Sequence, residues 1–83
     1  MSDVQLHLMN DNEVHGMDVE TALMSVFGMT NEAAEVYTYD AHTQGHSIIF
    51  TGDEQEAIRK GGELAMLGIN TELTLVGGEL FGN

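Results

Sequence analysis

The chain of 83 residues is long enough for one small domain with a single modest core. Its 14 acidic residues against two basic ones give a formal net charge of −12, which excludes the basic surface that nucleic acids and anionic membranes require, and which favours cationic ligands or serves solubility. The absence of cysteine excludes disulfides and thiolate sites, and with no membrane-length apolar run or signal-peptide pattern, a cytoplasmic protein is expected.

The first predicted element is a strand in "VQLHL", where three apolar residues alternate with polar ones from Val4 onwards. The strand runs into Asn10, Asp11 and Asn12, three short side chains rich in hydrogen-bond acceptors. Such residues commonly form a turn, because Asn and Asp bond their own backbone and tolerate left-handed conformations. The simplest interpretation is a turn, and the alternative is a set of acceptors for a ligand.

Two amphipathic helices are predicted next, because apolar residues recur at the i, i+3, i+4 spacing. The first carries its apolar stripe from Val19 to Phe27 and ends at Gly28, a suitable C-cap. The second begins after Thr30, which can cap its N-terminus, and it ends at Gly45. The two helices are therefore joined by a very short connection.

A second strand and a third helix follow. In "HSIIFT" the strand pattern places Ile48 and Phe50 on one face and Ser47, Ile49 and Thr51 on the other. Thr51 begins the capping-box spacing with a glutamate three residues later, which predicts the start of the third helix. The predicted core stripe of that helix is Ala57, Ile58, Gly61, Leu64 and Ala65.

The end of the chain completes the predicted fold. Gly61 and Gly62 indicate a close contact between the third helix and the sheet, since each glycine costs about 1 kcal/mol relative to alanine. "TELTLV" predicts a third strand, and "GGELFGN" is expected to be a frayed tail. The order β-α-α-β-α-β predicts an α+β fold, a small three-stranded antiparallel sheet packed against three helices. We expect one domain over residues 1–77 and a flexible tail over residues 78–83.

An enzyme and a metal-binding module are the two alternatives to a protein that only binds a ligand. No serine or threonine has a plausible base and orienting group, so neither an enzyme nor a cofactor is predicted. A zinc or nickel site is an alternative, although the only close histidine pair along the chain is in "HTQGH". The candidates for such a metal-binding module are His7, His15, His42, His46, Asp11 and Asp40.

The stretches "NDN", "VFG" and "AHTQG", in this order and spacing from Asn10 to Gly45, resemble the ClpS family of adaptors, which recognise N-degrons for the Clp protease. Sequences of that family carry Asn-Asp-Asp followed by Thr-Pro-Met, and later a histidine with a glycine three residues on. The resemblance implies a ClpS-like fold and a non-enzymatic adaptor. Its partners would be N-terminal peptides with Phe, Tyr, Trp or Leu first, and the N-domain of an AAA+ Clp unfoldase.

The resemblance also implies which residues bind the peptide. A free α-amino group presents an ammonium with three donors, which needs oxygen or imidazole acceptors. Asn10 and an unprotonated nitrogen of His42 would accept from the ammonium, and Asp11 would bond the first peptide units or supply charge. The first side chain of the ligand would enter an apolar pocket between the first two helices. The implied pocket residues are Val14, Gly16, Met17, Val19, Thr38 and Ala41.

The chain departs from the family pattern in two places. Val14, His15 and Gly16 replace Thr-Pro-Met, so a glycine takes the place of the bulky methionine unless a one-residue shift brings Met17 there. Because residues 38 and 41 are also small, we predict a wider pocket that accepts Phe, Tyr and Trp and is less well filled by Leu. The family's N-terminal extension hands over substrate, whereas only "MSD" precedes the first strand here. A competitor that sequesters N-degrons without delivery is therefore an alternative.

Overall fold

The elements follow the predicted order along the chain. The computed structural model describes residues 3–76, so the predicted tail over residues 78–83 lies outside the described residues. The elements are β1 (Val4–Met9), α1 (Gly16–Phe27), α2 (Asn31–Gln44), β2 (His46–Gly52), α3 (Glu54–Met66) and β3 (Thr71–Leu75). This order confirms the predicted β-α-α-β-α-β arrangement.

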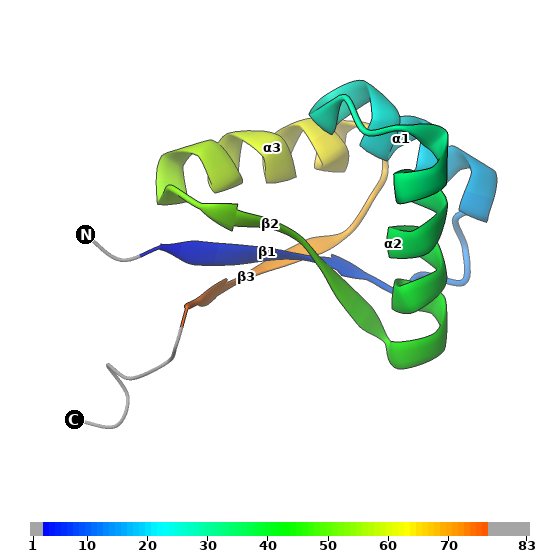
Figure 1. The fold of residues 1–83 in the computed structure, drawn as a ribbon, viewed down its shortest axis with the longest axis horizontal. Coiled ribbons are helices and arrows are strands. Elements are labelled where there is room, and N and C mark those ends of the chain that lie inside the picture. Colours follow the sequence, from blue (N-terminus) through cyan, green and yellow to red (C-terminus); the bar gives the residue numbers. More distant parts are fainter. Residues whose placement is uncertain (1–2, 77–83) are drawn as a thin grey trace.

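The sheet is antiparallel with strand order β2-β1-β3, so the first strand lies in the middle. Residues of β1 alternate between a buried and a half-exposed face, because only one side of the sheet is covered by helices. α2 and α3 pack on the sheet, and α1 packs against both of these helices (Figure 1). The largest fully buried side chains of this core are Leu6, Leu8, Leu23 and Leu64.

A β-bulge changes the predicted faces of β2. The register passes from Leu6 opposite Phe50 to His7 opposite Ile48, which leaves Ile49 as an extra residue. Ile49 is buried, and the next residue, Phe50, packs against the same core. The prediction that Phe50 shares a face with the exposed Ile48 is therefore wrong, because the bulge interrupts the two-residue period.

The helix ends confirm most of the predicted caps. Gly28 and Gly45 end α1 and α2 in the left-handed region, with φ of 72° and 95°, and the Thr30 hydroxyl accepts from the backbone N–H of Ala33. The cap of α3 differs from the prediction. Asp53 takes this position and accepts from the N–H three residues later, because β2 continues to Gly52 and includes the predicted capping residue.

The face that α3 turns to the sheet also differs from the predicted stripe. Ala57 and Leu64 are buried as predicted, whereas Ile58 and Ala65 are exposed. The contact line follows the i, i+4, i+7 positions 57, 61 and 64. A Cβ at Gly61 would lie 3.2 Å from the hydroxyl of residue 71, which confirms the close contact at this glycine. The same prediction is wrong for Gly62, which faces open space.

Candidate functional site

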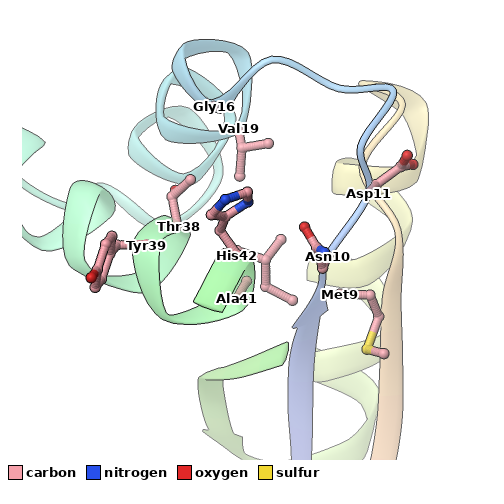
Figure 2. Close-up of a pocket in the computed structure, with 10 residues that line it drawn as sticks. Met9, Asn10, Asp11, Gly16, Val19, Thr38, Tyr39, Ala41 and His42 are labelled. Atoms are coloured by element: carbon pink, nitrogen blue, oxygen red, sulfur yellow. The ribbon is translucent and has the colours of Figure 1, made fainter. Parts of the chain in front are cut away.

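A cavity of about 320 Å³ opens where the end of β1, the beginning of α1 and the last turns of α2 meet. Asn10 and Asp11 line it just beyond the end of β1, His42 lines it from the last turns of α2, and Val19 of α1 and Ala41 of α2 add apolar surface (Figure 2). No helix within residues 3–76 has the length and apolar character needed to span a membrane. The residues that line the cavity are Leu8, Met9, Asn10, Asp11, Gly16, Val19, Thr38, Tyr39, Ala41 and His42.

Seven of the nine candidate residues lie together at this cavity, and two do not. Met17 is 77% exposed and points elsewhere, so Gly16 rather than Met17 contributes to the wall. Val14 packs against the core and lines a different hollow beside the outer side of α1. Gly16 begins α1 and lines the cavity, whereas Met17, the alternative given by a one-residue shift, does not line it.

Three lining residues were missed by the sequence interpretation. Leu8 and Met9 directly precede the acceptor run, and Tyr39 lies one helical turn before His42 on the same side of α2. Helical spacing from His42 could have identified Tyr39. Tyr39 is 66% exposed and lines the cavity, so an aromatic side chain is available beside the polar groups.

Asn10 and His42 are brought together by a backbone link between β1 and the end of α2. The Asn10 N–H donates to the Gly45 carbonyl at 3.0 Å, three residues beyond His42. Figure 2 shows the Asn10 amide and the His42 ring facing a common space from the two elements. Both side chains are exposed, so their oxygen and nitrogen acceptors are accessible to a ligand.

Asp11 has a different position from these two residues. Its Oδ1 accepts from the backbone N–H of Glu13 at 2.9 Å, and its Oδ2 accepts from the Asn70 side chain at 2.9 Å. The Val14 N–H also donates to the Asp11 carbonyl at 3.2 Å. Figure 2 shows the carboxylate directed away from the His42 ring. Asp11 therefore forms the turn that is the simplest interpretation of the Asn-Asp-Asn stretch. Its carboxylate stabilises the loop that leads into α1.

The apolar part of the cavity is formed by small side chains from the two helices. A Cβ built at Gly16 would lie 3.8 Å from the Thr38 methyl group, which is an ordinary contact. Backbone geometry therefore does not demand glycine at residue 16, and its missing side chain leaves space. The Thr38 hydroxyl is buried and has no hydrogen-bond partner within the described residues. Val19 and Ala41 complete this apolar side.

The four histidines do not gather at one place. His7 and His46 meet across the sheet, with 3.1 Å between their Nδ1 atoms. His42 lines the cavity, and His15 precedes α1 at its N-terminus. In the part of the chain that the structure describes, no group of three or more His, Asp or Glu side chains is arranged to hold a metal ion. The combined histidine and aspartate site considered above is therefore not assembled among these residues.

Comparisons with known proteins agree with the fold. A family model described as ATP-dependent Clp protease adaptor protein ClpS matches residues 1–72. The solved structure of Agrobacterium tumefaciens ClpS2 bound to L-phenylalaninamide is similar, with a TM-score of 0.87 and 20% identity over 89% of this chain and 96% of that chain. Comparison with curated proteins gives no match. Because the family match spans most of the chain, this protein belongs to the ClpS family of Clp protease adaptors.

Proposed function

We propose that this protein is a non-enzymatic adaptor that binds the free α-amino group and the bulky first side chain of N-degron peptides. One observation carries the proposal: two accessible hydrogen-bond acceptors, Asn10 and His42, line the same cavity as a set of apolar side chains. A peptide N-terminus has this same division into a charged donor group and a side chain. Binding would be reversible and would need no covalent step.

The ammonium group would bind between the Asn10 amide oxygen and an unprotonated nitrogen of His42. Hydrogen bonds to a charged donor are stronger than neutral ones, which suits two acceptors in a partly enclosed space. Asp11 would act mainly as a positioning residue, since both of its carboxylate oxygens already accept hydrogen bonds within the chain. Its negative charge would still favour a cationic ligand.

The first side chain would enter the space beside Gly16, Val19, Thr38 and Ala41. A cavity of about 320 Å³ lies at the lower end of the range for ligand sites, about 300–1,000 Å³, and suits one large side chain. The related ClpS2 was solved with L-phenylalaninamide, which combines a free α-amine with an aromatic side chain. We propose the same kind of ligand here, with Phe, Tyr and Trp preferred over Leu because a smaller side chain leaves unfilled space.

The proposed test is fluorescence anisotropy with labelled peptides that differ only in their first residue. A peptide beginning with Phe should bind, whereas its N-acetylated form should lose binding because the ammonium donors are gone. Asn10→Ala and His42→Ala should each weaken binding, and His15→Ala, which is outside the cavity, serves as the matched control. Equal binding of the free and acetylated peptides would refute recognition of the N-terminus.

Delivery to the N-domain of an AAA+ Clp unfoldase is the second half of the proposal. It can be separated from capture by measuring degradation of an N-degron substrate by a Clp protease with increasing adaptor. Faster degradation would support delivery, and the effect should vanish in the His42→Ala protein. Slower degradation would support the alternative of a competitor that sequesters N-degrons.

A further inference from the structure

A second cluster of polar side chains lies on the uncovered face of the sheet, apart from Asn10 and His42. His7 of β1 and His46 at the start of β2 approach each other there, with ring centroids 5.1 Å apart and Nδ1 atoms 3.1 Å apart. They share a hollow with Met9, Glu72 and Thr74. The two imidazoles are thus held at contact distance by strand pairing rather than by a flexible loop.

The hydrogen bonds around His7 suit the tautomer that carries its hydrogen on Nε2. The Thr74 hydroxyl donates its hydrogen to the Gln5 side-chain oxygen at 3.4 Å. With its hydrogen on Nε2, the His7 ring donates to the Thr74 hydroxyl at 2.8 Å. Neutral His7 then keeps an unprotonated Nδ1, which is aimed at His46. A second hydrogen bond that fixes the ring and its tautomer is typical of histidines that bind metal ions.

The separation of the two nitrogens matches that of two ligands on one ion. A metal about 2.0–2.1 Å from each imidazole nitrogen separates them by about 2.9–3.4 Å, as the angle at the metal passes from square to tetrahedral. The observed 3.1 Å lies within this interval. We propose that His7 and His46 form a two-histidine site for a late first-row divalent metal ion such as Zn²⁺ or Cu²⁺.

The ion would take the place of the hydrogen now shared between the two Nδ1 atoms, and the proton of His46 would move to its Nε2. Because no third protein ligand is in place within residues 3–76, water would occupy the remaining positions. Glu72, the cross-strand neighbour of His7, contributes negative charge at the same hollow.

The test is titration of the full, tag-free chain with ZnCl₂ at pH 7.5, followed by calorimetry and by the ring resonances of the histidines in NMR spectra. We expect one ion per chain, the first changes at His7 and His46, and a loss of affinity of about tenfold or more in His7→Asn and in His46→Asn. His15→Asn is the matched control and should bind as the unchanged chain does. His42→Ala should also keep the ion, which separates this site from the proposed peptide site.

Three results would overturn the proposal: unchanged affinity in His46→Asn, first changes at the rings of His15 or His42, or no Zn²⁺ binding at all. If an Asn variant fails to fold, the order in which the histidine rings respond in the unchanged chain decides the question. With CuSO₄, electron paramagnetic resonance should show two equivalent imidazole nitrogens on the ion. A spectrum with only one such nitrogen would contradict a shared site.

Discussion

The Asp11 carboxylate accepts a hydrogen bond from the Asn70 side chain at 2.9 Å, which joins residues that lie 59 positions apart in the chain. The neighbouring backbone strengthens the same connection, because the Met9 N–H donates to the Asn70 carbonyl at 3.1 Å. The loop that leads from β1 to α1 is thereby fastened to the turn before β3. The position of the Asn10 acceptor depends on this attachment.

We therefore expect Asn70→Ala to weaken peptide binding although residue 70 does not line the cavity. One lost hydrogen bond of about 1 kcal/mol corresponds to about a fivefold change in affinity. Asp11→Ala should weaken binding at least as much, and Asn12→Ala, an exposed neighbour in the same loop, should have little effect. Anisotropy titrations of the three variants provide the measurement. If only Asp11→Ala weakens binding, its carboxylate contacts the ligand directly.

Gly16→Met should narrow the apolar part of the cavity. The site of its Cβ has room, since the nearest atom is the Thr38 methyl at 3.8 Å, so the added side chain can extend into the cavity without disturbing α1. The affinity for a peptide beginning with Trp should fall by about tenfold or more, while that for Leu should hold or improve. The ratio of the two dissociation constants measures the effect. An equal loss for both peptides would mean that residue 16 does not set the preference.

Thr38→Val should stabilise the fold. The substitution keeps the shape of the side chain and removes a buried hydroxyl that has no partner among the described residues. Since an unsatisfied buried group costs about 1–3 kcal/mol, the free energy of unfolding should rise by about 1 kcal/mol in urea titrations. Thr38→Ala is the comparison, and it should gain less because it also loses the methyl contact. A less stable Val variant would show that the hydroxyl has a partner in solution.

The adjacent glycines of α3 should respond in opposite ways to alanine. Gly62 faces open space, so Gly62→Ala should raise the free energy of unfolding by about 1 kcal/mol through better helix propensity. At Gly61 a Cβ would lie 3.2 Å from the Thr71 hydroxyl and 3.4 Å from a Leu6 methyl. Gly61→Ala should therefore lose that gain or lower the stability. Equal stabilisation by both substitutions would contradict the close packing of α3 on the sheet.

The His7 and His46 pair should make the fold less stable in acid. Burial first, and then the charge of His46, lower the pKa of His7 below its ordinary 6.5, while Glu72 opposes them. As the pH falls below that value, the unfolded chain takes up a proton that the folded chain binds less readily, so the stability contribution present at neutral pH is lost. Between pH 7.5 and 5, His7→Asn should lose less stability than the unchanged chain. Chemical denaturation gives the free energy of unfolding at each pH. An equal decrease in the two proteins would show that His7 does not cause the loss of stability in acid.

The order and type of all six elements could be predicted because hydrophobic period and helix caps are local properties of the sequence. The start of α3 could not be placed, since "TGD" offers two capping residues and the extent of β2 decides between them. The bulge at Ile49 could not be predicted either. It depends on how β2 pairs with β1, which is a relationship between distant segments.

The resemblance to the family led to nine candidate residues, and seven of them, among them Asn10 and His42, line one cavity. Their roles in binding stay predictions. Motif position alone could not separate the side chain that faces the cavity from the one that supports the loop. Asp11 belongs to the second kind because its partner, Asn70, is a residue that no local pattern connects to it. The exclusion of Met17 likewise required the starting point of α1.

The main chain and the side chain of Asn10 have different roles. Its main-chain N–H donates to the Gly45 carbonyl, which links the end of β1 to the end of α2, while its side chain faces the cavity. Any amino acid except proline can supply the main-chain hydrogen bond. The side chain at residue 10 can therefore be changed while the hydrogen bond that links β1 to the end of α2 is kept. Residue 10 is the natural position at which to redesign what this adaptor recognises.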